Sequence, residues 1–309
     1  MLAPRPRNPA LPGDQGDRTG TAGILRRARA EIRRRFDSLL REVLAIFNGI
    51  PVLAANDVRA RTFYQLTPEQ LSALSAALQA ALDRWIASGR ESATLFWWSP
   101  FVAEAVQLGT AQTAANLRNV SSQYAAARSL QQVVMSQPYV SRLAMAQTKS
   151  YEHWTGLSQG LRSELAELIG RAVIDGKNPR AVRTEIAERL GVSKSRALGY
   201  AQTDITDSLR QARVAEKDAA EDELGIRLGL LWTSALKPTT RPTHAARNGK
   251  VYTSAEVREF YSRDGNRYRC HCSVTECLLD EDGKPILTKE LRSTMAAARA
   301  AWQRQYGER

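Results

Sequence analysis

Cysteine and histidine are both scarce in this sequence. Its 309 residues include three histidines and three cysteines, and the cysteines, Cys270, Cys272 and Cys277, all lie in one short segment. A local set of odd number is a poor disulfide framework, so we expect thiols that are either reduced and buried or bound to a metal ion. The few histidines leave little material for a histidine-based catalytic site.

Long apolar segments are also missing. No run of apolar residues approaches the roughly twenty that a transmembrane helix needs, so we expect no membrane insertion. Residues 1–7 contain prolines and arginines and lack the apolar core of a secretory signal. We therefore expect a protein that is made and used in a cytoplasm.

Acidic side chains are outnumbered by basic ones. The sequence has 44 Lys and Arg against 32 Asp and Glu, which gives a formal net charge of +12. This excess is clustered as well as large, and it favours a polyanionic partner such as DNA, RNA or an acidic protein surface. Hydrophobic residues make up 43% of the chain, which is enough for most of it to fold.

The composition changes along the chain and predicts consecutive regions. Residues 1–22 are rich in Pro, Gly, Asp and Arg and predict a disordered basic arm. An N-terminal helical region follows at 23–135, then a domain at 136–285 and a C-terminal helix at 286–309. The expected fold class is mainly α, an extended helical body followed by a small α+β C-terminal module with short strands.

Apolar periodicity and capping residues predict the helices of the body. Thr67-Pro68 and Ser99-Pro100 are typical helix starts, because Ser and Thr cap the first turn and Pro suits its first position. The predicted helices are 24–47, 67–89, 99–135 with a break near Asn119, 157–175, 179–190, a further helix ending near 224, and 289–303. Residues 186–193, which include Gly191, are similar to a helix-turn-helix, although such a turn is common in helical proteins.

The segment after residue 225 differs from the helical body. Short β-prone stretches at 229–234, 250–253 and 270–278 are separated by turn residues. They predict a small β-containing module at 229–280, which follows the helices of 157–224 within the domain at 136–285.

The predicted helix at 24–47 carries an excess of arginine. Its apolar residues recur in steps of three and four and form one stripe. The other faces carry a cluster of basic residues: Arg26, Arg27, Arg29, Arg33, Arg34 and Arg35. Two interpretations are open, a solvated helix face or a basic surface that contacts DNA phosphates or acidic partner subunits.

Four residues of the C-terminal module have side chains that bind zinc: His244, Cys270, Cys272 and Cys277. A Cys-x-Cys pair on a strand or tight turn places both thiolates on one side, and His244 would approach from the preceding loop. Zinc would stabilise a module with little core of its own. The alternative is reduced, half-buried cysteines beside a hydrogen-bonded His244, and we expect no other cofactor.

Several residues of the C-terminal half occur in a distinctive order. They are Trp232, Thr240, Arg241, His244, Gly249, Cys270 and Cys272, preceded by the helical stretch 200–204. This order resembles the phage Mu protein F-like head-morphogenesis family over roughly residues 140–285. The chain departs from the family at Gln202 and Asp204, where Arg and Glu are usual, and at Lys237, where an acid is usual. The loss of that acid argues against a strict catalytic carboxylate.

The resemblance implies a phage minor head, or minor capsid, protein that is not an enzyme. Such a protein would associate with the portal protein during procapsid assembly, and with the major capsid or scaffold proteins. It would also bind packaged double-stranded DNA without sequence preference. Its expected location is the host cytoplasm during assembly and then the virion, inside the head near the portal.

Two other functions compete with this interpretation. One is a metal-dependent nuclease that uses His244 and His271, and the other is a zinc-containing DNA-binding regulator with its helix-turn-helix at 186–193. The sequence offers no paired carboxylates near these histidines, no nucleophile motif and no phosphate-cradling glycine loop. We predict no catalytic residue, and we expect Arg241 to pair with Asp204 or Asp207 inside the fold.

Overall fold

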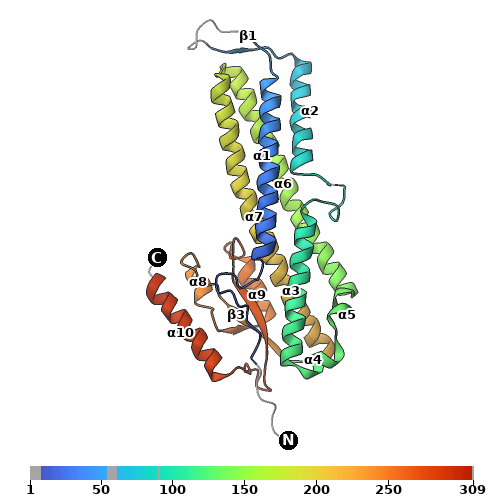
Figure 1. The fold of residues 1–309 in the computed structure, drawn as a ribbon, viewed down its shortest axis with the longest axis vertical. Helices are drawn as coiled ribbons and strands as arrows, with labels where there is room; N and C mark the ends of the chain where they lie inside the picture. Colours follow the sequence, from blue (N-terminus) through green and yellow to red (C-terminus); the bar gives the residue numbers. More distant parts are fainter. Residues whose placement is uncertain (1–7, 54–60, 90, 308–309) are drawn as a thin grey trace. The chain divides into compact units, whose positions relative to one another are not determined.

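The computed structural model describes residues 8–53, 61–89 and 91–307. It is 66% helical with two small antiparallel sheets (Figure 1), which confirms the mainly α fold class with short C-terminal strands. The elements in chain order are α1 (Ala22–Asn48), β1 (Val52–Leu53), β2 (Phe63–Tyr64), α2 (Pro68–Trp85), α3 (Ser99–Val120), α4 (Ser122–Ala127), α5 (Leu130–Val134), α6 (Gln137–Asp175), α7 (Pro179–Leu224), β3 (Leu228–Thr233), α8 (Pro242–Ala245), β4 (Val251–Tyr252), α9 (Ser254–Ser262), β5 (Ser273–Leu278) and α10 (Lys289–Tyr306).

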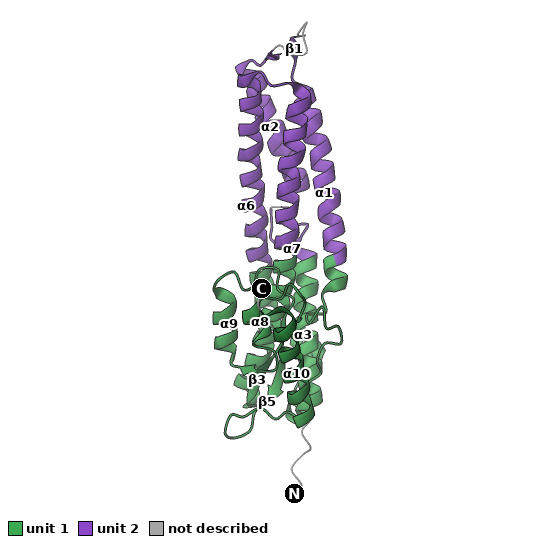
Figure 2. Cartoon of the chain, turned by 90° about the vertical axis from the view of Figure 1, so that its left-hand side faces the viewer, with its two compact units in different colours: residues 1–25, 101–146, 202–309 green, residues 26–100, 147–201 purple. Residues whose placement is uncertain are grey.

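The chain divides into two compact units, each built from separated segments. Unit 1 comprises residues 1–25, 101–146 and 202–309, and unit 2 comprises residues 26–100 and 147–201 (Figure 2). The sequence predicted consecutive regions instead. The difference arises because a long helix such as α7 contributes residues to both units.

Unit 2 contains parts of α1, α2, α6 and α7, which run side by side in Figures 1 and 2. The apolar stripe of α1 is buried as predicted, with Ile32, Leu39 and Val43 at 0% exposure. Thr67 caps α2 and Gln70 completes a capping box, as the sequence also predicted. The short hairpin β1–β2 had no counterpart in the sequence predictions.

Aromatic rings fill another part of the unit 2 core. The ring centroids of Trp97 and Trp98 lie 4.8 and 5.1 Å from that of Trp154. Phe96 packs edge-on against Tyr151 at 5.3 Å. Such tilted and edge-on pairs stabilise a core beyond the area they bury.

Helix α7 runs without a break through the predicted turn. The helix-turn-helix expected at 186–193 is therefore wrong. Ile186, Leu190 and Ala197 are all at most 2% exposed, so the apolar stripe of the helix continues past Gly191. Gly191 itself is exposed, and a glycine on the solvent side of a helix costs only about 1 kcal/mol relative to alanine.

Two other helix predictions need comment. Helix α6 begins at Gln137, well before the predicted start at 157, so residues 137–156 extend it. The predicted break near Asn119 is confirmed, because Ser121 and Ser129 each cap a new short helix, α4 and α5. No helix of the described residues is long and apolar enough to cross a membrane.

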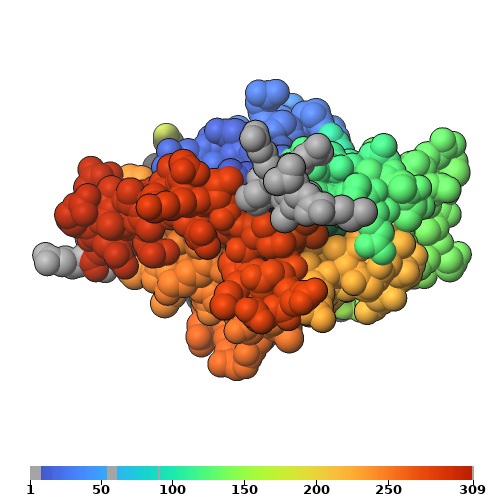
Figure 3. All heavy atoms as spheres, turned by 90° about the horizontal axis from the view of Figure 1, so that it is seen from below, coloured from blue at the N-terminus to red at the C-terminus, as the bar shows by residue number. Residues whose placement is uncertain are grey.

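Unit 1 is organised around a three-stranded antiparallel sheet of order β4-β3-β5. All six residues of the central strand β3 are buried. In Figure 3 the C-terminal residues, coloured orange and red, form one contiguous part of the face in view. Helix α3 packs closely on the unit 1 part of α7, since a Cβ atom on Gly109 would lie 2.4 Å from the Leu209 carbonyl oxygen.

The described part of the predicted N-terminal arm contacts the rest of unit 1. Residues 8–21 form no helix or strand. However, the amide of Asn8 donates to Thr288 Oγ1 at 3.0 Å, and the Ala10 N–H donates to Asn116 Oδ1 at 2.8 Å. Asp17 and Thr19 are buried. The prediction of a disordered arm is therefore wrong for this segment, because polar groups of the arm form hydrogen bonds with Asn116 of α3 and with Thr288 before α10. Residues 1–7 lie outside the described residues.

Candidate metal centre

The candidate site lies in unit 1, where the loop after β3, helix α8 and the segment before β5 meet. Trp232 at the end of β3 is fully buried and stacks on Tyr261 with centroids 5.2 Å apart. Its ring also packs edge-on against His244 at 6.0 Å. Phe260 lies 4.9 Å from the same histidine. These rings enclose the His244 side chain and restrict its position by packing.

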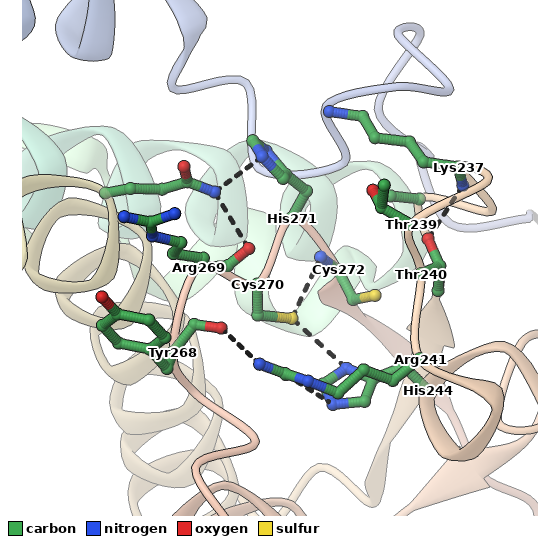
Figure 4. A pocket seen from close by; sticks show the side chains of 12 residues that line it. Lys237, Thr239, Thr240, Arg241, His244, Tyr268, Arg269, Cys270, His271 and Cys272 are labelled. Atoms are coloured by element: carbon green, nitrogen blue, oxygen red, sulfur yellow. Dashed lines mark hydrogen bonds between the residues drawn. The ribbon is translucent and has the colours of Figure 1, made fainter. Parts of the chain in front are cut away.

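Three of the four predicted ligands come together at this point (Figure 4). The ligand atoms of His244, Cys270 and Cys272 all lie within 4.8 Å of one another, and all three residues are buried. Cys270 Sγ lies 3.4 Å from His244 Nδ1. The Cys-x-Cys pair lies in the segment before β5 and not in the strand itself, because β5 begins at Ser273.

Cys277 does not belong to this group. It sits within β5, packs with Leu231, Leu287 and Met295, and its thiol lies 3.6 Å from the Gly229 carbonyl oxygen. Burial raises the pKa of Cys277 to about 12, so this thiol is a packing residue. The predicted ligand set was therefore wrong in including Cys277, because the structure groups only His244, Cys270 and Cys272.

The hydrogen bonds of His244 determine which nitrogen faces the thiols. Asn266 Nδ2 donates to the Phe260 carbonyl oxygen at 3.0 Å, so Asn266 Oδ1 is left to face His244 Nε2 at 3.2 Å. Because Oδ1 only accepts, this contact favours a proton on Nε2, whereas Arg241 Nη1, a donor 3.3 Å from the same nitrogen, favours an unprotonated Nε2. Nδ1 is directed at Cys270 Sγ, 3.4 Å away.

Polar groups surround both sulfur atoms. The Cys272 N–H donates to Cys270 Sγ at 3.3 Å, and the Tyr261 hydroxyl lies 3.7 Å from the same atom. The Ser234 hydroxyl lies 3.4 Å from Cys272 Sγ. Contact with the Cys272 thiol, assisted by His244 and Arg210, lowers the pKa of Cys270 well below that of an ordinary thiol, and the same contact raises the pKa of Cys272.

Arg210 of α7 forms hydrogen bonds with the backbone of the Cys-x-Cys segment. It is 2% exposed, and its Nη1 donates to the carbonyl oxygens of Cys270 and Cys272, both at 3.3 Å. Its charge is balanced by Asp207 at 3.7 Å, and its guanidinium lies 4.3 Å from the centre of the Tyr261 ring. Arg210 was not predicted as a site residue, because nothing in the charge pattern of the helix marks one arginine as buried.

Two more residues of α7 hold the same loop. Gln202 Nε2 donates to the Arg269 carbonyl oxygen at 3.0 Å, and the Arg269 N–H donates to Thr203 Oγ1 at 3.1 Å. Arg269 has a φ of 50°, a left-handed conformation that is uncommon for a residue with a side chain. The loop is therefore held in an unfavourable turn directly before Cys270, and such turns persist only where the surrounding structure fixes them.

A pocket of about 390 Å³ borders the three-residue group. Beyond the ligands, its lining includes Lys237, Thr240, Arg241 and His271. His271 is not part of the ligand group, and its Nε2 lies 2.6 Å from Gln202 Nε2. The pocket therefore has basic and hydroxyl groups on its walls and two thiols and an imidazole at its base.

The other motif residues shape the loops around the site. Thr240 Oγ1 accepts a hydrogen bond from the Lys237 N–H at 2.8 Å and closes the turn that leads to α8. Gly249 has a φ of 78°, and a Cβ atom there would lie 2.7 Å from Met295 Cβ, so both backbone conformation and space require glycine. The structure thus brings the motif residues together around one short sheet.

Arg241 does not form the ion pair that the sequence predicted. Its guanidinium donates to the carbonyl oxygens of Asn266 and Tyr268, at 3.0 and 2.7 Å. Among the described residues it has no contact with Asp204 or Asp207. Asp207 lies instead near Arg210, one helical turn away. Arg241 is thus a positioning residue for the loop that carries Asn266.

The arginines of α1, in unit 2, divide into two groups. Arg26, Arg27 and Arg33 are exposed. Arg34 and Arg35 both bond to Glu31, at 2.6 and 2.8 Å. Arg35 also donates to the Trp85 carbonyl oxygen at 2.9 Å and lies 4.1 Å from the centre of the Trp97 ring. Arg35 is therefore held by contacts within unit 2, whereas the sequence had placed it in the basic surface that contacts DNA or a partner.

These observations define a helical protein with a small antiparallel module that holds a Cys2His group. Residues 163–275 match the model of the family described as Phage Mu protein F like protein, the same family that the order of the motif residues resembles. The matched segment includes His244, Cys270 and Cys272 and ends before Cys277. No curated protein and no solved structure gives a significant match.

Proposed function

We propose that this chain is a phage minor head protein that acts in head morphogenesis by binding other molecules. The match of residues 163–275 to the Mu protein F-like family is the observation that carries the proposal. In this role the chain associates with the portal protein during procapsid assembly, and with the major capsid or scaffold proteins. It resides in the host cytoplasm during assembly and afterwards inside the virion head, near the portal.

A basic surface on α1 supports a contact with packaged double-stranded DNA. Arg26 and Arg33 are exposed and form no ion pair or hydrogen bond with any residue that the structure describes. Arg27 is exposed as well. Arginine side chains that are not neutralised internally are available to phosphates, and binding of this kind depends on charge and not on base sequence.

Neither competing function is favoured by a specific observation. A nuclease that uses His244 would need carboxylates or water-activating groups around it, whereas its ring nitrogens face Cys270 and Asn266. The regulator loses its recognition element, because α7 is continuous through residues 186–193.

The proposed role in the head is tested by quantitative mass spectrometry of purified virions and of portal complexes isolated from infected cells. We expect the chain in both samples, at low copy number relative to the major capsid protein. Its absence from both would contradict the proposal. Its presence in virions but not with the portal would contradict the portal association alone.

The proposed DNA contact is tested by fluorescence anisotropy of a labelled duplex at increasing salt. Binding should weaken steeply with salt and be equal for two unrelated sequences. The variant Arg26→Gln/Arg33→Gln should bind more weakly, and the slope of log affinity against log salt should fall by about two.

A matched control removes the same charge from α10. Arg292 and Arg304 are both exposed, and Arg292→Gln/Arg304→Gln should leave the slope close to that of the parent chain. Equal losses in the two variants would show that total charge, and not the α1 surface, governs binding. No salt dependence in the parent would overturn the DNA contact.

A further inference from the structure

The spacing of the three ligand atoms fits a tetrahedral metal ion. With zinc–sulfur and zinc–nitrogen bonds of about 2.3 and 2.0 Å, tetrahedral geometry places the ligand atoms about 3.5–3.8 Å apart. Cys270 Sγ and His244 Nδ1 are 3.4 Å apart, and all three ligand atoms lie within 4.8 Å of one another. A zinc ion between them requires each separation to change by no more than about 1 Å, in side chains that already converge.

The histidine is oriented as a metal ligand would be. A metal ion on Nδ1 leaves the proton on Nε2, which lies 3.2 Å from Asn266 Oδ1 and 3.3 Å from Arg241 Nη1. Asn266 is itself held by the Phe260 carbonyl oxygen. Metal-binding histidines usually donate their second ring nitrogen to an oxygen acceptor in this way, which fixes the tautomer and the ring plane. Two further contacts hold the neighbouring loop, since Arg241 donates to the backbone of Asn266 and Tyr268.

Hydrogen-bonding groups and a buried cation lie around the two sulfur atoms. A backbone N–H donates to Cys270 Sγ, and hydroxyls of Tyr261 and Ser234 lie beside the two sulfurs. Arg210 adds a buried positive charge beneath the Cys-x-Cys backbone. Hydrogen-bond donors and a cation lower the cost of holding two sulfur anions in a buried place.

We propose that His244 Nδ1 and the sulfur atoms of Cys270 and Cys272 bind a zinc ion. Thiolate and imidazole ligands favour zinc over magnesium or calcium, which prefer oxygen. The fourth position faces the pocket beside the group and is occupied there by water. The ion would link His244 of α8 to Cys270 and Cys272, which precede β5. It would therefore add a strong cross-link between two segments of the module.

The first test is metal analysis of the full chain, purified without chelators from zinc-supplemented medium. We expect about one equivalent of zinc per chain. Replacement by cobalt should give the visible bands of a tetrahedral site and the charge-transfer absorption of cobalt–thiolate bonds. A zinc content far below stoichiometric, or octahedral cobalt spectra without thiolate absorption, would overturn the proposal.

Matched cysteine variants locate the site. Cys270→Ser and Cys272→Ser should each lose the metal, whereas Cys277→Ser removes an equally buried thiol of the same module and should keep it. Loss of metal in Cys277→Ser but not in Cys270→Ser would place the site elsewhere and overturn the assignment. An intact-mass decrease of two hydrogens that is absent from Cys270→Ser would identify a Cys270–Cys272 disulfide and also overturn it.

A variant that keeps all three ligands guards against simple misfolding. Asn266→Ala removes the oxygen acceptor beside His244 Nε2, together with the hydrogen bond to the Phe260 carbonyl oxygen, and leaves all three ligands in place. The chain should still bind zinc but lose it to a competing chelator at roughly ten- to a hundred-fold lower chelator concentration. An affinity equal to that of the parent would contradict the role of His244. The proposal is independent of the role in head assembly, since the metal content does not depend on any partner.

Discussion

The two units of the molecule bury different kinds of side chain. Unit 2 buries apolar and aromatic residues on helices, such as the stripe of α1 and the cluster around Trp154. Unit 1 also buries charged and polar groups, including Glu276, Arg213, Arg210 and His244, each at most 2% exposed. Apolar burial tolerates changes of shape, whereas a buried charge depends on each of its partners. The two units should therefore respond differently to substitution.

The largest effect is expected at the buried ion pair of unit 1. Glu276 accepts from Arg213 Nη2 at 2.8 Å, from Thr113 at 2.9 Å and from Asn116 at 3.0 Å. Glu276→Ala leaves Arg213 buried without its partner and should lower the free energy of unfolding by about 4 kcal/mol. Denaturant unfolding, followed by circular dichroism, measures this change.

The double variant Arg213→Met/Glu276→Leu is the control for that prediction. Both charges are then replaced by apolar groups of similar size, so much of the lost stability should return. A double variant as unstable as Glu276→Ala would mean that shape and not charge is responsible, and the contrast between the units would weaken.

A smaller effect is expected in unit 2. Leu39 of α1 is 0% exposed, and Leu39→Ala should cost about 3 kcal/mol, because buried methyl groups are lost and a cavity remains. The same substitution at Leu95, which is 71% exposed, should cost less than about 0.5 kcal/mol. Thermal unfolding of both variants compares them directly, and equal costs would show that α1 is not the core helix of this unit.

The smallest effect concerns the surface charges of unit 2. The hydrogen bond from Arg34 lowers the pKa of Glu31 from 4.5 to about 2. A carboxyl with a lowered folded-state pKa contributes stability above its unfolded pKa and loses that contribution as pH falls from about 4.5 to about 2. Since Glu31 is partly exposed, the contribution should stay below about 1 kcal/mol.

The measurement is the stability difference between the parent chain and Glu31→Gln as a function of pH. The difference should be present at neutral pH and shrink as the solution is acidified through that range. A difference that is constant or grows with acidification would show that the interaction with Arg34 does not persist in solution.

Local sequence signals predicted much of unit 2 and part of unit 1. The stripe of α1 and the cap of α2 depend on residues three or four positions apart, so the sequence alone indicates them. The strands at 228–233 and 251–252 were expected close to where they occur. The same local signals failed at Gly191, where the expected turn is overridden by an apolar face that stays buried on both sides.

The site shows where sequence-based prediction ends. The residue types and their order identified His244, Cys270 and Cys272 and their family, now matched over residues 163–275. The same reasoning added Cys277, because spacing along the chain does not show which thiol points toward a histidine. It also omitted Arg210, Asn266 and Ser234, whose residue types are common at surfaces and carry no mark of burial.

The sequence by itself determined the helical class, the apolar stripes and the set of side chains able to bind a metal. These properties depend on residue type and on short-range periodicity. Only the tertiary structure decided that Cys270 and Cys272 converge with His244 while Cys277 packs in a strand. It also decided that Arg35 is held by Trp85 and Trp97 while Arg26 and Arg33 stay exposed. Such contacts join residues far apart in the chain, and the pairing of distant segments, not their composition, determines which groups meet.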